Sequence, residues 1–167
     1  MIRIGHGYDI HRFSDEKSEA TLVLGGVSIP YERKLLAHSD GDLVIHAVCD
    51  ALLGAIALGD IGQHFPDTQE EYKNKNSGYF LQKILNDVKK KGYRVGNLDV
   101  SIIAEAPKLT PFKMQMRKNL ADSLEVSIDD VNVKATTHEK LDAIGNKQGI
   151  AAHAVVLLMV NHANTTE

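Results

Sequence analysis

The stretch GHGYDIHRF, residues 5–13, combines the pattern of a β-strand with two side chains that can bind a metal ion. Because side chains in a strand alternate between its two faces, Gly7, Asp9 and His11 share one face. The opposite face is mostly apolar and carries Ile4, His6, Tyr8 and Ile10. A carboxylate beside an imidazole supplies part of a zinc site. The same pair also occurs as a simple hydrogen-bonded pair at a sheet edge, so the stretch predicts a strand over about 2–13 and leaves both roles open.

A helix downstream could supply a third metal ligand. Residues 43–59, LVIHAVCDALLGAIALG, are apolar enough for a buried helix that ends near Gly59. In the preceding loop HSDGD, residues 38–42, either Asp40 or Asp42 can accept hydrogen bonds from the first amides of this helix. Asp42, His46 and Asp50 are spaced four residues apart and therefore share one face of it.

His46 on this largely apolar helix has two interpretations. It could be a core histidine that is hydrogen-bonded to Asp42 or Asp50. It could instead join Asp9 and His11 in a site with an open fourth position, which is typical of catalytic zinc. In that case Asp50 could orient His46 by accepting a hydrogen bond from the ring nitrogen that does not bind the metal.

The remaining pattern alternates strands and helices. We expect an α+β sandwich. Its single mixed sheet should have four strands and carry helices on one face, and a small hairpin should lie beside it. Ser77 can cap a second helix that Gly92 ends. The other expected elements are a hairpin-like stretch at 21–30, a long polar loop at 60–76, strands at 93–106, 131–137 and 149–160, and a loop leading into a helix over 107–125.

Length and composition limit the class of protein. The 167 residues suit a single domain, 1–167, and are 43% hydrophobic and 25% charged, as in ordinary globular proteins. A net charge of -3 disfavours nucleic acid as a partner. The single cysteine, Cys49, fits a reducing compartment. No apolar run is long enough to span a membrane, and no secretory signal is recognisable at the N-terminus. We therefore expect a cytoplasmic protein, or a protein of a plastid-type stroma if a targeting segment was removed.

Three further clusters could bind phosphates or a polyol. In KATTHEKL, residues 134–141, a carboxylate, hydroxyls and turn amides could hold a phosphate and a hard cation, or Thr137 could simply cap a helix. In GDIGQHFPDT, residues 59–68, two aspartates could bind a polyol or only shape turns. In AEAPKLTPF, residues 104–112, Lys108 could meet a phosphate, although a solvated loop is the simpler alternative.

Four motifs together resemble the 2-C-methyl-D-erythritol 2,4-cyclodiphosphate synthase family over essentially the whole chain. They are RIGHGYDIHRF at 3–13, LLAHSDGDLVIHAVCDALLGAIALGDIGQHFPDT at 35–68, GYRVGNLDVSIIAEAPKL at 92–109 and VNVKATTHEKL at 131–141. The resemblance implies release of CMP from 4-diphosphocytidyl-2-C-methyl-D-erythritol 2-phosphate, in the non-mevalonate route to isoprenoids. It implies that Asp9, His11 and His46 bind Zn²⁺ and that Glu139 binds Mg²⁺ or Mn²⁺.

The resemblance also implies a substrate-binding set. In the family, the positions of His38 and Thr137 stabilise the transition state. Ser39 and Lys134 stand at phosphate-contacting positions, residues 60–62 at the erythritol segment and residues 104–110 at the cytidine pocket. The complete implied set is Asp9, His11, His38, Ser39, Asp60, Ile61, Gly62, Phe65, Asp67, Ala104, Pro107, Lys108, Leu109, Lys134, Thr136, Thr137 and Glu139.

Members of the family are homotrimers whose sites lie between subunits, and the resemblance implies the same assembly here. One segment departs from the family pattern. Many bacterial members line a cavity on the threefold axis with a phenylalanine and an arginine, where this chain has Ala143 and Asn146. We therefore expect no binding of an isoprenoid diphosphate in the usual way, although the neighbouring Lys147 could partly substitute.

Two other functions fit the same residues. A metal-dependent phosphodiesterase or phosphatase would use the same ions with water as the attacking group and would give a linear product. A non-catalytic, zinc-stabilised trimer would bind CDP without turnover. The mass of the product separates the phosphodiesterase from cyclisation, and the absence of turnover would identify the binding protein.

Overall fold

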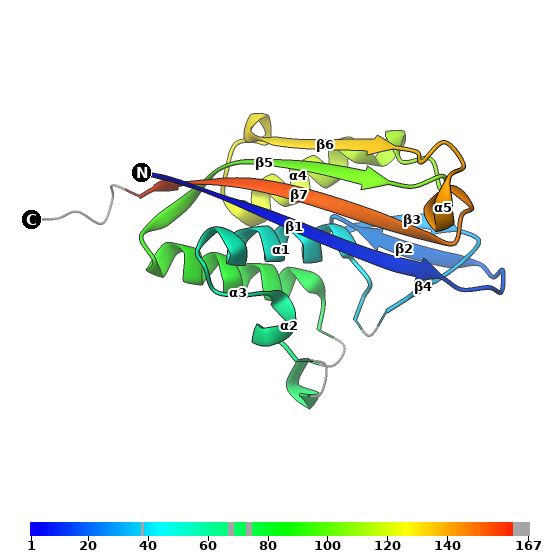
Figure 1. Ribbon diagram of the computed structural model, residues 1–167, viewed down its shortest axis with the longest axis horizontal. Helices are drawn as coiled ribbons and strands as arrows, with labels where there is room; N and C mark the ends of the chain where they lie inside the picture. Colours follow the sequence, from blue (N-terminus) through cyan, green and yellow to red (C-terminus); the bar gives the residue numbers. More distant parts are fainter. Residues whose placement is uncertain (38, 67–68, 73–74, 162–167) are drawn as a thin grey trace, which may run out of the picture.

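A computed structural model describes residues 1–37, 39–66, 69–72 and 75–161 of the chain. Within these residues five strands form one mixed sheet in the order β4-β1-β7-β5-β6, and two more form a separate hairpin (Figure 1). The sheet strands are β1 (Ile2–Phe13), β4 (Leu35–Leu36), β5 (Tyr93–Ile103), β6 (Val131–Thr136) and β7 (Gly149–Val160), and the hairpin strands are β2 (Ala20–Leu24) and β3 (Val27–Tyr31).

The three long helices cover one face of this sheet, whereas the short last helix packs at the end of the other face, where Ile144 forms a small buried cluster with Ile103 and Ala151. In the described chain the helices are α1 (Leu43–Ala55), α2 (Ile61–His64), α3 (Ser77–Lys90), α4 (Lys113–Leu124) and α5 (Asp142–Gly145), with short 3-10 turns at Glu70–Tyr72, Thr110–Phe112 and Ile128–Asp130. Figure 1 shows α1 lying along β1, α3 next to α1, and α4 behind β5 and β6. The predicted α+β architecture is confirmed. The predicted four-stranded sheet is wrong by one strand, because the two-residue β4 pairs with the end of β1.

Strand direction places the chemistry at one end of the sheet. β7 runs antiparallel to both β1 and β5, and β5 runs parallel to β6. The carboxyl ends of β1, β5 and β6 therefore point the same way, as their arrowheads show in Figure 1. The segments that carry the sequence motifs follow these ends or lie on them.

Glycine in β1 lets α1 lie directly on the strand. A Cβ atom on Gly5 would stand 1.8 Å from the carbonyl oxygen of Ala51, and one on Gly7 would stand 1.8 Å from that of Ala47. Both distances are far inside van der Waals contact, so only glycine permits this approach. The backbone of α1 thus packs against β1 on the same face of the strand that carries Asp9.

Two helix ends differ from the prediction. The helix expected to end near Gly59 ends at Ala55, and the next residues turn with Ala57 at a φ of 56°. The cap of α3 is Asn76, whose side chain accepts from the amide of Tyr79, rather than Ser77. Ser77 is the first residue inside the helix and is fully buried. The caps at Asp42 and the end of α3 before Gly92 are as predicted.

Apart from the end that α5 covers, the other face of the sheet is largely exposed among the described residues. Its apolar side chains include Ile2, Ile4, Tyr8, Ile10 and Val155, each at least 43% exposed. His6 and His153 lie among them, with 3.0 Å between His6 Nε2 and His153 Nδ1. None of the helices in the described residues is long and apolar enough to cross a bilayer.

Candidate active site

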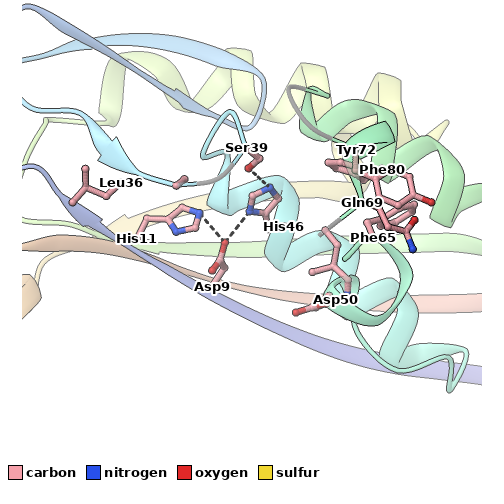
Figure 2. Close-up of a pocket in the computed structure, with 13 residues that line it drawn as sticks. Asp9, His11, Leu36, Ser39, His46, Asp50, Phe65, Gln69, Tyr72 and Phe80 are labelled. Atoms are coloured by element: carbon pink, nitrogen blue, oxygen red, sulfur yellow. Dashed lines mark hydrogen bonds and ion pairs between the residues drawn. The ribbon is translucent and has the colours of Figure 1, made fainter. Parts of the chain in front are cut away.

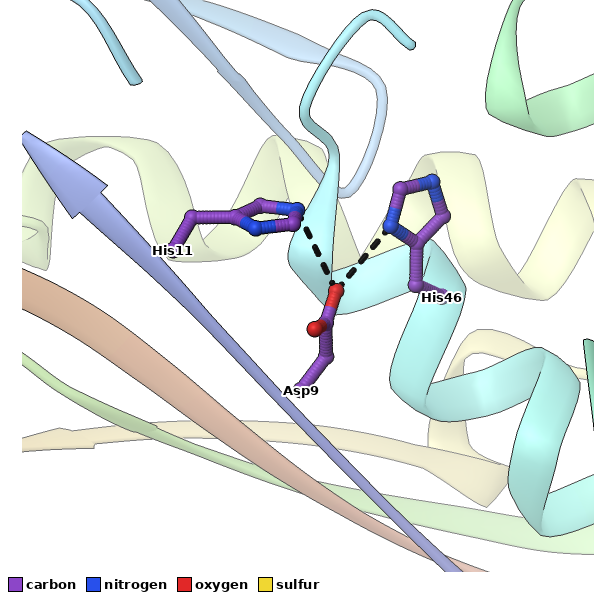
Figure 3. Close-up of side chains that lie close together, drawn as sticks. All are labelled: Asp9, His11 and His46. Atoms are coloured by element: carbon purple, nitrogen blue, oxygen red, sulfur yellow. Dashed lines mark hydrogen bonds and ion pairs between the residues drawn. The ribbon is translucent and has the colours of Figure 1, made fainter. Parts of the chain in front are cut away.

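Asp9, His11 and His46 converge where the first turns of α1 face the second half of β1 (Figure 3). One ligand atom from each lies within 4.8 Å of the other two. Asp9 Oδ2 is 3.0 Å from His46 Nδ1 and 3.3 Å from His11 Nε2. The strand alternation predicted from residues 5–13 and the helix predicted from residues 43–59 thus bring their polar groups to one point.

The three side chains fit a divalent metal ion. A carboxylate oxygen and two imidazole nitrogens form a donor set that zinc accepts. His11 Nε2 is buried and has no hydrogen-bonding partner in the described part of the chain, although a carboxylate oxygen is near. A buried nitrogen without a partner is costly, and a metal ion bound by its lone pair would remove that cost.

In each of the two imidazoles, burial lowers the pKa and the Asp9 carboxylate raises it. Burial lowers the pKa of His11 below its ordinary value, with the charge of Asp9 offsetting only part of the effect. Burial also lowers the pKa of His46, but the hydrogen bond and charge of Asp9 outweigh it, so that pKa is raised. The lowered pKa favours the neutral form of His11, which can bind a metal directly, whereas the raised pKa of His46 means that a metal would compete with a proton there.

A cavity of about 460 Å³ opens beside the three side chains (Figure 2). Phe65, Tyr72 and Phe80 form an aromatic group at its far side, with 4.7 Å between the ring centres of Phe65 and Phe80. With a divalent cation held by Asp9, His11 and His46, the polar end would suit an anionic group, and the apolar end would suit a carbon chain. The lining residues are Asp9, His11, Leu36, Ala37, Ser39, His46, Asp50, Ile61, Gly62, Phe65, Gln69, Tyr72 and Phe80.

The two aspartates expected near His46 have other partners. Asp42 is buried and accepts hydrogen bonds from the amides of Gly25, Gly26 and Ile45. Burial nevertheless raises its pKa to about 6. Asp50 lines the cavity, and its Oδ1 accepts from the amide of Ile61 at 2.8 Å. Neither carboxylate is the hydrogen-bonding partner of His46 predicted from the helix spacing, because the nitrogens of that imidazole face Asp9 and two serines.

The segment at residues 59–68 reaches the cavity through some of its residues. Ile61, Gly62 and Phe65 line the cavity, whereas Asp60 caps α2 by accepting from the amide of Gln63 at 2.9 Å. His38 and Asp67, which the resemblance implies in the site, lie outside the described residues.

A second cluster joins the ends of β5 and β6. Glu105, just after β5, accepts from the amides of His138 and Lys140 at 3.0 and 3.2 Å. These bonds hold the turn in which Thr137 Oγ1 accepts from the amide of Glu139 at 3.3 Å. Thr137 therefore shapes this turn and does not cap a helix, since α5 starts at Asp142 without a side-chain cap.

The two clusters do not share a cavity in the single chain. The residues that line the 460 Å³ cavity include none of the implied residues from 104 onward. Lys134 instead pairs with the Asp99 carboxylate on the exposed face of β5 and β6. Ala104 and Leu109 are buried at the end of β5, whereas Lys108 and Glu139 are exposed. The catalytic set expected from the resemblance is thus divided into two groups.

Sequence reasoning missed several residues of the site. Ser77 was expected only as a helix cap, yet its hydroxyl lies 2.8 Å from His46 Nε2. Glu105 was not singled out, although it fixes the turn at Glu139. Gln69 and Tyr72 line the cavity from a stretch expected to be only a loop. A polar residue at the first position of an otherwise apolar helix face was the one available signal for Ser77, and a single sequence offers none for Tyr72.

Comparison with known proteins gives a consistent result. The model of the YgbB family matches residues 2–159. The chain is 58% identical over 158 residues to 2-C-methyl-D-erythritol 2,4-cyclodiphosphate synthase of Proteus mirabilis, covering 95% of this chain and 97% of that protein. The complex of Plasmodium falciparum IspF with CDP is 39% identical with a TM-score of 0.84, covering 96% and 97% of the two chains.

A longer relative shares the same fold. The bifunctional IspDF of Campylobacter jejuni is 42% identical with a TM-score of 0.89, and the match covers 96% of this chain and 42% of that one. Sequence identity and fold agree from the first strand to the last. The chain therefore belongs to the YgbB family.

Proposed function

We propose that this chain converts 4-diphosphocytidyl-2-C-methyl-D-erythritol 2-phosphate to 2-C-methyl-D-erythritol 2,4-cyclodiphosphate and CMP. The observation that carries the proposal is the convergence of Asp9, His11 and His46 beside a cavity with one polar and one apolar end. The proposal is supported by sequence similarity, because the chain is 58% identical to a protein named for this activity. The enzyme is accordingly a phosphorus–oxygen lyase of the non-mevalonate pathway.

The reaction needs no protein nucleophile. An oxygen of the 2-phosphate forms a bond to the β-phosphorus, and the bond from the β-phosphorus to the bridging oxygen breaks, so that CMP leaves without addition of water. The protein must bring two anionic groups of one molecule together in line. The cavity between the Asp9, His11 and His46 triad and the aromatic group of Phe65, Tyr72 and Phe80 would hold the carbon chain that links the two anionic groups of the substrate.

Two cations complete the proposed site. Asp9, His11 and His46 would hold zinc, and the exposed carboxylate of Glu139 would hold magnesium or manganese. When bound, such ions neutralise and polarise phosphate oxygens. His38 and Thr137 are proposed to stabilise the transition state and Ser39 to contact a phosphate. Residues 60–62 would hold the erythritol and residues 104–110 the cytidine, with Lys134 near the phosphates. Phe65, Asp67 and Thr136 would also contact the substrate.

We propose a homotrimer, which would bring the two clusters of different subunits together. Two features support it. The implied residues beyond position 103 lie outside the triad cavity of their own chain. The largely exposed sheet face also carries Ile2, Ile4 and Ile10, which a neighbouring subunit could bury. We further propose that residues 1–167 form one catalytic domain and that the protein acts in the cytoplasm, or in a plastid-type stroma.

The test is incubation with the cytidylyl substrate, zinc and magnesium, with products read by phosphorus NMR and mass spectrometry. The proposal expects CMP and a cyclic diphosphate whose mass equals that of the substrate minus CMP. A product heavier by one water would indicate a phosphodiesterase. Tight binding of CDP with no turnover would indicate a binding protein, and either result would refute cyclisation.

A further inference from the structure

We propose that Ser77, backed by Asp40, is a positioning residue that holds the His46 imidazole with its Nε2 protonated, so that Nδ1 is left for the metal. This inference rests on the metal site of the proposed function. Ser77 is the first residue of α3 and is fully buried. Its Oγ lies 2.8 Å from His46 Nε2, and it also contacts the Asp40 carboxylate.

The chemistry of the three groups fixes the direction of each hydrogen bond. An ionised carboxylate only accepts, and a hydroxyl has a single proton to donate. Ser77 therefore donates its proton to Asp40 and can only accept from His46. The proton of that bond must be on Nε2 of His46. The opposite nitrogen, Nδ1, lies 3.0 Å from Asp9 Oδ2, on the side where the triad converges. Since the Asp9 carboxylate also only accepts, Nδ1 donates a proton to it when no metal is bound, and a metal ion would replace that proton.

Asp40 is itself held in place. Its Oδ2 accepts from the backbone amide of Ser77 at 2.8 Å, and its Oδ1 accepts from the amide of Asp42 at 3.2 Å. A carboxylate at the first turn of a helix is also favoured by the partial positive charge of the free amides there. The loop before α1 and the start of α3 are thus tied together at the point where they meet His46.

Ser39 is a weaker candidate for the same role. Its Oγ is 3.4 Å from His46 Nε2 and also accepts from the amide of Gly41 at 3.3 Å. Ser39 lines the cavity, where its hydroxyl is available to a phosphate. Ser77 Oγ lies closer to His46 Nε2 than Ser39 Oγ does, and Ser77 is fully buried. Its hydroxyl therefore stays hydrogen-bonded to the imidazole when a ligand enters the cavity.

A metal-binding imidazole depends on such a partner. Donation from the second nitrogen selects the tautomer, fixes the ring and makes the ligating nitrogen more basic, and removal of the partner typically weakens metal binding by about 10- to 100-fold. We expect Ser77→Ala to weaken zinc binding by that factor.

The experiment measures the zinc dissociation constant by competition with a chelator, without substrate, for the full-length wild type, Ser77→Ala and Asn76→Ala. Asn76→Ala is the matched control, because it removes the cap of the same helix without touching His46. We expect it to lower the melting temperature and to leave zinc affinity unchanged. Equal zinc affinity of Ser77→Ala and wild type, within about threefold, would overturn the role of Ser77. Failure of the wild type itself to bind zinc would overturn the metal site as well.

A second measurement needs no variant. Nitrogen NMR of histidine-labelled, zinc-loaded wild type distinguishes the two tautomers of His46. We expect a protonated Nε2 and a metal-bound Nδ1. A metal-bound Nε2, or a proton on Nδ1, would overturn the proposal even if Ser77→Ala did not fold.

Discussion

Gly7→Ala tests the packing that brings Asp9, His11 and His46 together, although Gly7 has no side chain that could bind a metal or substrate. The new Cβ would stand 1.8 Å from the carbonyl oxygen of Ala47, whereas ordinary contact begins at 3.4 Å. The strand and the helix must therefore move apart by about 1.6 Å. The obstacle is helix backbone, so no side-chain rotation can relieve it.

The magnitude follows from this displacement. Over-packing a core costs about 1–3 kcal/mol and occasionally more, and a backbone clash belongs at the upper end. A loss of about 3 kcal/mol lowers the melting temperature by roughly 6–12 °C in a domain of this size. Metal–ligand distances tolerate only about 0.2 Å, so moving His46 away from Asp9 and His11 should also weaken zinc binding at least about tenfold.

The assay is urea unfolding and zinc competition at matched protein concentration, with Gly54→Ala as the control. Gly54 lies in the same helix, and its added Cβ would stand 3.9 Å from the nearest atom, the carbonyl oxygen of His6. We expect Gly54→Ala to stabilise the protein by about 0.5–1 kcal/mol and to keep zinc. If Gly7→Ala were within about 1 kcal/mol of wild type and bound zinc normally, close packing of α1 on β1 would not be what forms the site.

Three further outcomes follow from the same structure. The buried Asp42 carboxyl has a folded pKa of about 6 against an ordinary 3.8, so its protonated form favours the fold. Its contribution to the free energy of unfolding should fall by about 2 kcal/mol as the pH rises from 4 to 7, and the stability difference between wild type and Asp42→Ser should change by that amount in urea titrations; a constant difference would contradict the shift. Glu105→Ala removes the acceptor of two amides and should cost about 1–3 kcal/mol and raise the magnesium concentration needed for turnover, whereas Glu105→Gln keeps an acceptor oxygen and should retain most of both. An unchanged magnesium titration in Glu105→Ala would show that this turn does not hold the cation. Thr137→Ala should lower the turnover number with zinc still bound, and an unchanged rate would remove Thr137 from the transition state.

Local patterns in the sequence were sufficient for most of the fold. Alternation identified β1 and β7, and the run after Asp42 identified α1, because both signals depend only on neighbouring residues. The two-residue β4 has no pattern of its own and exists only by pairing with β1. The number of strands in the sheet was therefore wrong by one.

Spacing was less informative about the site than about the fold. Alternation placed Asp9 beside His11, but only the close approach of α1 at Gly7 joins them to His46, and this approach depends on two segments distant in sequence. The i+4 spacing offered Asp42 or Asp50 as a hydrogen-bonding partner of His46. Its partners are Asp9, Ser39 and Ser77. Ser77 lies on a different helix and could not be found from periodicity.

The central claim is that Asp9, His11 and His46 bind one metal ion together. The most direct measurement is anomalous diffraction at the zinc absorption edge from crystals of the zinc-loaded protein. The account predicts one strong peak within bonding distance of a carboxylate oxygen of Asp9, Nε2 of His11 and Nδ1 of His46. Crystals with bound zinc elsewhere, and with these three side chains directed to different places, would contradict it.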